Sequence, residues 1–250
     1  MSVPADAAAH VFVADIAVPE IDDDTGHHLR RVRRLRPGVR CTATDGAGAW
    51  RWCRLGEDGS LEPDGEVVRA PRATPEIVIA FALTKGGKPE LVVQKLTELG
   101  IDRIVPFRAE HSVVRWDGDK AADHHRRWQA VVVAALEQSR GCWLPRVDPV
   151  ADLDSVVGLG AIRLDRGGRA PSLRRPVLAV GPEGGWSDAE RAALPETVGI
   201  ATNVLRAETA ALTAGGVMTS LRSGAVRERD VSGGRTRNFG GNVTTGSDRR

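Results

Sequence analysis

The chain has 250 residues, of which 41% are hydrophobic and 27% are charged, and its formal net charge at pH 7 is +2. These values suit a folded protein with one large domain or two small ones. They argue against a membrane-spanning protein, because no apolar run reaches the length of a transmembrane helix. The N-terminus has no signal-peptide pattern, so we expect a cytoplasmic protein.

The cysteines and histidines show no pattern typical of a metal site. Cys41, Cys53 and Cys142 are odd in number and lack metal-ligand spacing, so we expect reduced, structural thiols. The histidine pairs at 27–28 and 124–125 are not part of an HExxH arrangement. We therefore expect no bound metal.

Arginine dominates the positive charge. Lysine occurs only at positions 85, 88, 95 and 120, which leaves 31 arginines among the 35 cationic residues. Arginine binds phosphate through two hydrogen bonds and stacks on bases, which suits an RNA partner. A genome-wide codon bias explains the same composition equally well, so the count does not decide between the two explanations.

The N-terminal part of the chain is predicted to form a small, mostly β module. Its pattern predicts a helix at 25–35, with Leu29, Val32 and Leu35 on the inner side. A hairpin turn is predicted at 45–46. The other expected elements are an apolar run at 10–16, strands at 39–44, 49–55 and 66–70, and a linker at 70–75.

In the rest of the chain, strands and helices alternate. The apolar run at 77–83 is continuous, as in a strand that is buried on both faces. A helix at 89–99 would turn Val92, Leu96 and Leu99 inward. The alternation predicts a parallel α/β sheet. The other expected strands lie at 103–107, 161–164, 177–180 and 200–205, and the other helices at 120–140, 188–194 and 209–221.

Two loops near the C-terminus are candidate ligand sites. GPEGG at 181–185 follows an expected strand, and Ser187 is a candidate N-cap of the next helix. This turn either binds a ligand through its backbone or is a tight connection, and its spacing leaves both possibilities open. LRAETA at 205–210 is expected to follow a strand. Because ligands of open α/β sheets bind at the carboxyl ends of strands, Arg206 and Glu208 are candidate site residues.

Five segments occur in the order, and with the residues, of one known family. They are HHLRRVRRLRPG at 27–38, KLTELG at 95–100, EQS at 137–139, GPEGG at 181–185 and LRAETA at 205–210. The chain resembles the RsmE family of SPOUT-class methyltransferases over about residues 10–222. Pro145 also falls where the family has a proline, whereas His111 and Gly141 stand where it usually has arginine.

The resemblance implies a fold. The expected fold is α/β, with a C-terminal SPOUT domain that has a parallel sheet and a deep trefoil knot, and with a small N-terminal PUA-like β-barrel domain. Residues 1–72 would form the RNA-binding PUA-like domain and residues 73–225 the SPOUT methyltransferase domain. Residues 226–250 are polar and rich in glycine and arginine, so we expect a disordered tail.

The resemblance also implies a function. Members methylate N3 of a specific uridine in small-subunit (16S) ribosomal RNA, use S-adenosylmethionine and act as homodimers with the RNA spanning both subunits. The alternative is a non-catalytic RNA-binding or ribosome-assembly factor with the same fold. An oxidoreductase is disfavoured, because the chain has no early G-x-G-x-x-G motif.

The resemblance assigns residues to the cofactor and to the reaction. The expected cofactor-binding residues are Leu164, Val180, Gly181, Pro182, Glu183, Gly184, Gly185, Leu205, Arg206, Thr209 and Ala210. Gly184→Val is expected to abolish cofactor binding by crowding the backbone. Arg206 and Glu208 are the candidate catalytic residues, because uridine N3 must lose a proton.

The candidate RNA-binding residues are basic. Arg30, Arg31, Arg33, Arg34 and Arg36 follow one another without an intervening carboxylate. A run of charge is commonly only a solvated face, but five arginines favour contacts with phosphate. Lys85 and Lys88 form either an RNA-facing edge or a solvated turn, and His111 is a further candidate contact with phosphate, with a charge that depends on pH.

Overall fold

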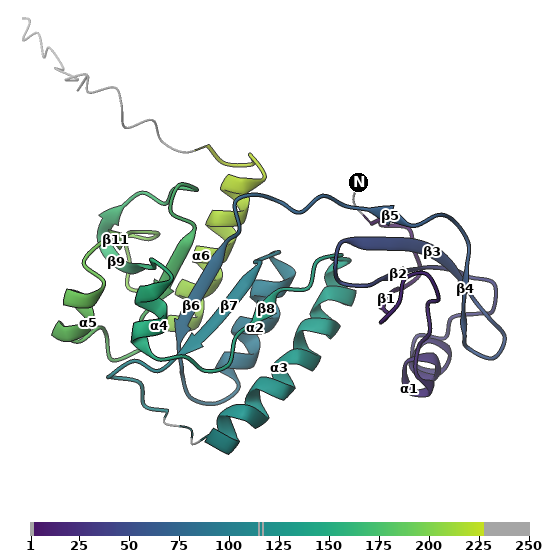
Figure 1. Ribbon diagram of the computed structural model, residues 1–250, viewed down its shortest axis with the longest axis horizontal. Helices are drawn as coiled ribbons and strands as arrows, with labels where there is room; N and C mark the ends of the chain where they lie inside the picture. Colours follow the sequence, from purple (N-terminus) through teal and green to yellow (C-terminus); the bar gives the residue numbers. More distant parts are fainter. Residues whose placement is uncertain (1–2, 115, 117, 228–250) are drawn as a thin grey trace, which may run out of the picture.

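The computed structural model describes residues 3–114, 116 and 118–227 and contains two β-sheets (Figure 1). The first sheet ends at Arg69 and the second begins at Val78, and the domain boundary between residues 72 and 73 stays a prediction. The expected disordered tail lies, from residue 228 onward, outside the described residues. None of the helices in the described part is both long and apolar enough to cross a membrane.

The first sheet is formed by the N-terminal residues. Its strands are β1 (His10–Phe12), β2 (Arg40–Thr44), β3 (Ala49–Leu55), β4 (Leu61–Pro63) and β5 (Val68–Arg69). The order is β1-β2-β3-β4, with β5 beside β3, and only the β1–β2 pair is parallel. The predicted turn joins β2 to β3. The Asp45 carboxylate there accepts hydrogen bonds from the backbone N–H groups of Ala47 and Ala49, at 2.8 and 3.0 Å.

The predicted N-terminal helix is shorter than expected. It consists of α1 (Asp23–His27) and the π-helical turn η1 (His28–Val32). Leu29 is buried as predicted, but Val32 is 64% exposed, so its expected inward position is wrong. The helix cannot continue, because Arg34 adopts a φ of 53°, in the left-handed region.

The second sheet confirms the predicted parallel α/β architecture. Its strand order is β11-β9-β10-β6-β7-β8, and all neighbouring pairs are parallel. The strands are β6 (Val78–Ala82), β7 (Arg103–Phe107), β8 (Arg146–Val147), β9 (Ile162–Arg169), β10 (Val177–Val180) and β11 (Thr197–Val198). The helices are α2 (Lys88–Glu98), α3 (Gly118–Ser139), α4 (Leu153–Gly158), α5 (Asp188–Ala193) and α6 (Ala207–Arg222).

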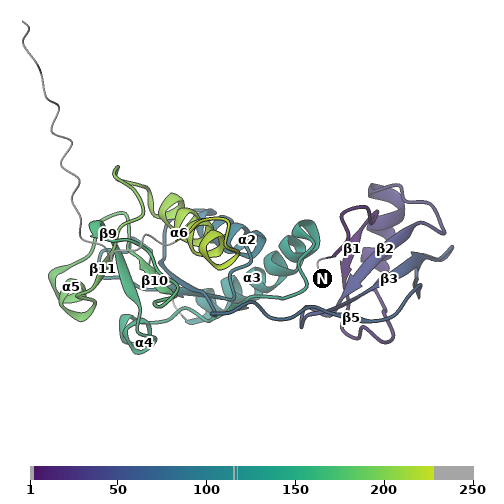
Figure 2. The same ribbon diagram turned by 90° about the horizontal axis from the view of Figure 1, so that it is seen from above.

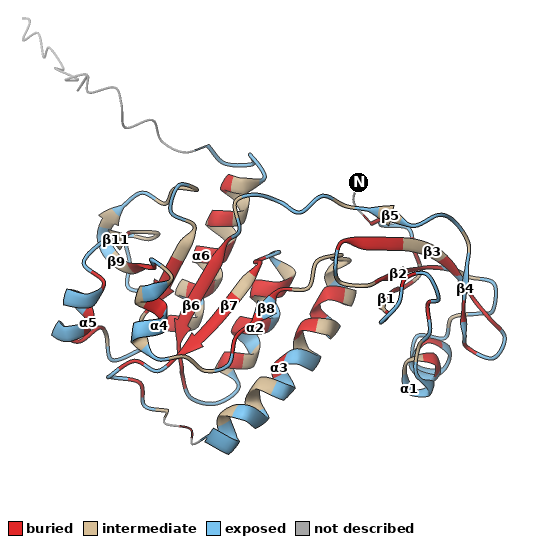
Figure 3. Ribbon diagram, in the orientation of Figure 1, coloured by how far each residue is buried: buried red, intermediate tan, exposed pale blue. Residues whose placement is uncertain are grey.

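Helices cover both faces of the second sheet. Helices α2, α3 and α6 lie on one face and α4 on the other (Figures 1 and 2). Ile79 and Phe81 of β6 pack into the hydrophobic core beneath α2, α3 and α6, whereas Ala80 and Ala82 pack into the core on the face covered by α4. Because successive side chains of a strand point to opposite faces, both sets are buried (Figure 3). This arrangement explains the continuous apolar run in the sequence.

A small residue lets α6 approach α2 closely. A Cβ atom on Gly215 would lie 2.7 Å from Cδ2 of Leu96, which is fully buried as predicted. Leu99 is 36% exposed, because α2 has already ended there and Gly100 follows with a φ of 75°. The expectation that Leu99 faces inward is therefore wrong.

The strand predicted at 200–205 is absent. Strand β11 ends at Val198, and residues 199–206 run to α6 without a strand or a helix. Ile200 and Leu205 line a pocket instead of joining the sheet. Their apolar character therefore reflects the pocket wall, and Arg206 lies at the start of a helix rather than at the end of a strand.

The C-terminal end of α3 contacts the first sheet. The Glu137 carboxylate accepts a hydrogen bond from the backbone N–H of Phe12, at 2.9 Å. Nε2 of His10 lies 2.7 Å from the Gly141 carbonyl oxygen and donates to it. Burial raises the pKa of Glu137 and lowers the pKa of His10. The EQS motif therefore helps to hold the two sheets together.

Candidate active site

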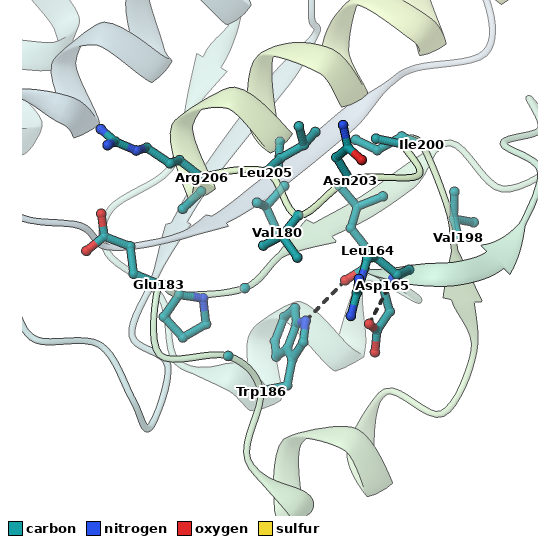
Figure 4. Close-up of a pocket in the computed structure, with 18 of the residues that line it drawn as sticks. Leu164, Asp165, Val180, Glu183, Trp186, Val198, Ile200, Asn203, Leu205 and Arg206 are labelled. Atoms are coloured by element: carbon teal, nitrogen blue, oxygen red, sulfur yellow. Dashed lines mark hydrogen bonds between the residues drawn. The ribbon is translucent and has the colours of Figure 1, made fainter.

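A pocket of about 640 Å³ lies beside β9 and at the carboxyl end of β10 (Figure 4). This volume is typical of small-molecule sites, and ligands of parallel α/β sheets bind at this edge. The first wall is formed by residues 164–166, the second by residues 180–186 except Gly184, and the third by residues between Val198 and Ala210. The side chain of Lys88 completes the lining.

The second wall is held by the start of α5. The side chain of Ser187 caps this helix by accepting a hydrogen bond from the backbone N–H of Glu190, and the Glu190 carboxylate accepts one from the N–H of Ser187. The same carboxylate also accepts from the N–H of Glu110, at 2.8 Å. The predicted N-cap is confirmed. These bonds fix the loop that contains the GPEGG motif.

Trp186 connects the first and second walls. Its indole Nε1 donates a hydrogen bond to the backbone carbonyl of Leu164, at 3.2 Å (Figure 4). Its ring stacks on Phe107 with a centroid separation of 6.0 Å. A Cβ atom on Gly181 would lie 2.7 Å from this ring. The glycine therefore makes room for the indole, in addition to exposing backbone to the pocket.

A second connection lies beside the first. Nε of Arg191 donates to the backbone carbonyl of Trp186 at 3.2 Å, and its terminal nitrogen contacts the Asp165 carboxylate at 2.9 Å. Arg163 also contacts Asp165, at 3.3 Å. Two arginines therefore fix the acidic group of the first wall.

The third wall ends at the start of α6. Arg206 has an extended backbone conformation and caps this helix without a side-chain hydrogen bond. Ala207 and Ala210 in the first turn line the pocket with small side chains. The backbone N–H groups of residues 207–209 have no partner within the helix, so the helix start is suited to an acidic group of a ligand.

Charged side chains from three elements meet at one end of the pocket. The Lys88 ammonium forms an ion pair with Glu183 and lies 3.5 Å from Oε1 of Glu208. The hydrogen bond with Glu183 raises the pKa of Lys88 and lowers the pKa of Glu183. Oε2 of Glu208 is buried and has no hydrogen-bond partner in the described residues. We call these three residues the Lys88 cluster.

Comparison with known proteins identifies the family. Residues 71–219 match the model of an RNA methyltransferase domain, and residues 21–61 match that of an RNA methyltransferase PUA domain. The chain is 34% identical over 233 residues to the ribosomal RNA small subunit methyltransferase E of Mycobacterium bovis, which covers 83% of this chain and 88% of that relative. The chain belongs to the ribosomal RNA small subunit methyltransferase E (RsmE) family.

Other RsmE proteins agree in sequence and in structure. The Bacillus subtilis protein is 31% identical over 215 residues, covering 74% of this chain and 83% of its own. The crystal structure of the Neisseria gonorrhoeae protein, bound to S-adenosylmethionine, superimposes with a TM-score of 0.71 at 27% identity. That match covers 85% of this chain and 97% of the other. The resemblance stated from the motifs is confirmed.

Most of the residues that the RsmE resemblance assigns to the cofactor line one pocket. They are Leu164, Val180, Gly181, Pro182, Glu183, Gly185, Leu205, Arg206 and Ala210. Thr209 and Glu208 do not line it, although Glu208 reaches it through Lys88. Gly184 points elsewhere, because a Cβ atom there would lie 2.9 Å from Cβ of His111. The expected effect of Gly184→Val therefore has to act through His111 and not by filling the pocket.

Sequence reasoning missed several lining residues. These are Trp186, Val198, Ile200, Ala201, Asn203, Val204 and Ala207. Trp186 could have been found, because it follows the GPEGG motif directly. The segment after Val198 was hidden by the incorrect prediction of a strand.

The candidate RNA-binding residues do not form one group in the structure. Arg30 and Arg33 donate to carbonyl oxygens of Glu57 and Ala8 within the N-terminal module, at 3.4 and 3.0 Å. The side chains of Arg31, Arg34 and Arg36 are exposed. In Figure 1, α1, which directly precedes these arginines, lies on the opposite side of the molecule from β9 and β10, beside which the pocket lies. Within one chain, the arginines are therefore remote from the pocket.

The remaining basic candidates lie near the pocket. Lys88 lines it, and Lys85 is exposed in the turn just before α2. Nδ1 of His111 lies 3.0 Å from the Gly185 carbonyl oxygen. His111 therefore contacts the second wall of the pocket.

The cysteines show no sign of a metal site. Cys41, Cys53 and Cys142 are free thiols, and burial raises the pKa of Cys53 to about 11. Across the part of the chain that the structure describes, no group of three or more His, Cys, Asp or Glu side chains could hold a metal ion.

Proposed function

We propose that the protein transfers a methyl group from S-adenosylmethionine to N3 of a uridine in small-subunit (16S) ribosomal RNA. The observation that carries the proposal is the pocket, whose three walls contain most of the residues that the family resemblance assigns to this cofactor. Membership of the RsmE family and the likeness to a relative with bound S-adenosylmethionine support it. Because the substrate is ribosomal RNA, the reaction takes place in the cytoplasm.

The residues of the pocket fit this cofactor. Leu164 and Val180 offer apolar surface to an adenine ring, and Ala210 leaves room near the backbone. Asp165 and Glu183 are acidic, which suits the positive sulfonium and ammonium groups. The uncapped start of α6 suits the carboxylate of the cofactor.

When bound, S-adenosylmethionine supplies an electrophilic methyl group. The protein has to orient the base and to take up the proton that leaves N3. We assign to Glu208 the role of general base, which accepts the proton from N3. We assign to Arg206 the role of a cation beside the uracil base. Both residues lie at the start of α6, next to the pocket.

The proposal extends to the architecture. We propose that residues 1–72 form the RNA-binding PUA-like domain, that residues 73–225 form a SPOUT domain with a deep trefoil knot, and that two chains form a homodimer. The position of β10 between the earlier strands β6 and β9 supports the knot. The arginines, which follow α1, lie on the opposite side of the molecule from β9 and β10 beside the pocket, and this separation supports RNA that spans two subunits.

The test combines cofactor binding with mapping of the product. Isothermal titration should detect binding of S-adenosylmethionine to the purified protein. Mass mapping of 16S ribosomal RNA from cells that lack the protein should show loss of one N3-methyluridine, and adding the protein with cofactor to their small subunits should restore it. Retention of full N3-methyluridine in those cells would contradict the proposal.

A further inference from the structure

The Lys88 ammonium has a donor to spare at the pocket. An ammonium group carries three N–H donors. Two of them are accounted for by Glu183 and by Oε1 of Glu208. Lys88 also lines the pocket. The third N–H is therefore available to a ligand that enters there.

Glu208 complements this donor with an acceptor. Its side chain is 15% exposed and its Oε2 atom is buried without a hydrogen-bond partner in the described residues. A buried carboxylate oxygen without a donor is costly, and an N–H group of a bound base would remove that cost. Oε1 faces Lys88, so donor and acceptor are neighbours.

We propose that Lys88 is a catalytic residue that works as a pair with Glu208: Lys88 donates a hydrogen bond to O4 of the target uracil while Glu208 accepts the proton of N3. This inference rests on the proposed function. It gives Lys88, which the sequence places at an RNA-facing edge or in a solvated turn, a contact with the reacting base.

The pair matches uracil and mismatches cytosine. Uracil presents an N–H donor at N3 beside a carbonyl acceptor at O4, which are the complements of a carboxylate and an ammonium. Cytosine presents a lone pair at N3 and an amino group at position 4, so Glu208 would face an acceptor and Lys88 a donor. Unpaired polar groups of this kind give strong discrimination between otherwise similar substrates.

The reaction balances with these two residues. The N3–H bond breaks and its proton moves to Glu208, the new N3–CH₃ bond forms, and the S–CH₃ bond breaks with its electron pair staying on sulfur. A sulfonium and a carboxylate thus become a neutral thioether and a neutral acid. Lys88 stays protonated and stabilises the negative charge that develops on O4.

Several charged groups surround the reacting position. Glu183 on the second wall and Lys88 on α2 face Glu208, and Arg206 lies two residues earlier on its own helix. The positive charges of Arg206 and Lys85 add to the effect of Lys88 in lowering the pKa of Glu183. Any dependence of the rate on pH has to be compared between variants that leave the other groups in place.

The experiment compares Lys88→Met, Lys88→Arg and Glu208→Gln with the unchanged protein. Glu90→Gln is the matched control, because Glu90 is also on α2 and also has a buried oxygen without a partner, but it pairs with His124 away from the pocket. The substrate is unmethylated small-subunit RNA with either uridine or 5-fluorouridine, whose N3–H is more acidic. Isothermal titration with S-adenosylmethionine shows that each variant is folded and loaded.

At saturating S-adenosylmethionine, Lys88→Met and Glu208→Gln should lower kcat on uridine RNA by about 100-fold or more. Lys88→Arg should retain part of the rate. The 5-fluorouridine RNA should recover at least about tenfold of each loss, and the rate of Glu208→Gln should rise about tenfold per pH unit, because hydroxide then removes the proton. Glu90→Gln should match the unchanged protein.

Two outcomes would overturn the inference, and they differ from failure of the proposed function. If the variants lose the same fraction of kcat on uridine RNA and on 5-fluorouridine RNA at every pH, Lys88 and Glu208 have only a structural role. Full activity of Lys88→Met would remove Lys88 from the reaction. If the unchanged protein binds cofactor but methylates neither RNA, the proposed function itself fails.

Discussion

The indole of Trp186 joins two walls of the pocket, because its Nε1 donates a hydrogen bond to the backbone carbonyl of Leu164 over 3.2 Å. The two residues are 22 positions apart in sequence, and they belong to the first and second walls of the pocket. The bond therefore sets the distance between two surfaces that have to enclose one ligand.

Trp186→Phe should keep the packing on Phe107 and lose this hydrogen bond. We expect the free energy of unfolding to fall by about 1 kcal/mol and the affinity for S-adenosylmethionine to fall more than stability alone requires. Trp186→Ala should cost about 3–5 kcal/mol, because it also leaves a cavity. Urea unfolding and isothermal titration measure the two effects. Unchanged affinity in Trp186→Phe would show that the bond does not shape the pocket.

Adjacent glycines of α6 should respond to alanine in opposite directions. At Gly215 a Cβ atom would meet Leu96 at 2.7 Å and Leu99 at 3.3 Å, whereas at Gly216 it would meet no heavy atom within 4 Å. Gly215→Ala should therefore destabilise the protein by about 1–3 kcal/mol through overpacking. Gly216→Ala should stabilise it by about 0.5–1 kcal/mol through helix propensity. Thermal and urea unfolding of the two variants decide the matter, and equal effects would contradict the close packing of α2 and α6.

The stability of the protein should depend on pH through His10. Burial lowers the pKa of His10 from its ordinary value of 6.5, so in the window below pH 6.5 the unfolded chain binds a proton that the folded chain does not. The contribution of neutral His10 to the free energy of unfolding is therefore complete above pH 6.5, and it is lost as the pH falls toward the pKa of His10 in the folded protein. Urea unfolding at about pH 7.5 and pH 5.5 should show a smaller fall for His10→Gln than for the unchanged protein.

Glu137 makes the free energy of unfolding depend on pH in the opposite direction, and it does so at lower pH than His10. Burial raises its pKa above 4.5, so its contribution is lost as the pH rises through the folded value. Since Glu137 is present in both proteins, the difference between them isolates His10. An identical fall in both would place the source of the pH dependence elsewhere.

The second wall should be sensitive to Gly184, although this residue does not face the pocket. Gly184→Ala would bring a Cβ atom to 2.9 Å from Cβ and 3.3 Å from the carbonyl oxygen of His111. We expect the loop to shift and the affinity for S-adenosylmethionine to fall by about tenfold, roughly 1.4 kcal/mol. The double variant Gly184→Ala with His111→Gly should recover part of the loss. No recovery would mean that the backbone, and not the histidine side chain, opposes the change.

Local signals allowed much of the fold to be predicted. The strands at 103–107 and 177–180 have the predicted bounds, because each contains a short apolar run bounded by charged residues or by proline and glycine. Ser187 caps α5 and Gly100 follows α2 as expected, because both positions depend on neighbouring backbone only. The GPEGG and LRAETA motifs indicated two of the three pocket walls.

The remaining features depend on contacts between distant residues. The segment 200–205 is apolar like a strand, but its partner surface is a pocket, and a single sequence does not distinguish the two. Trp186 binds a carbonyl 22 positions earlier, and Lys88 binds carboxylates from two later segments. These pairings cannot be predicted from charge and spacing along the chain. The sequence therefore indicated Lys88 only as part of an RNA-facing edge or a solvated turn.

The length of helix α3 sets the spacing between the two sheets. The helix has 22 residues, which correspond to about 33 Å of helix, and its last turn holds the backbone of Phe12 through Glu137. One inserted residue would therefore not only lengthen the spacing but also rotate the whole N-terminal module, with its exposed arginines, by about 100° around the helix axis. Changes in the length of this helix can preserve the direction of that basic surface only when they come close to whole turns.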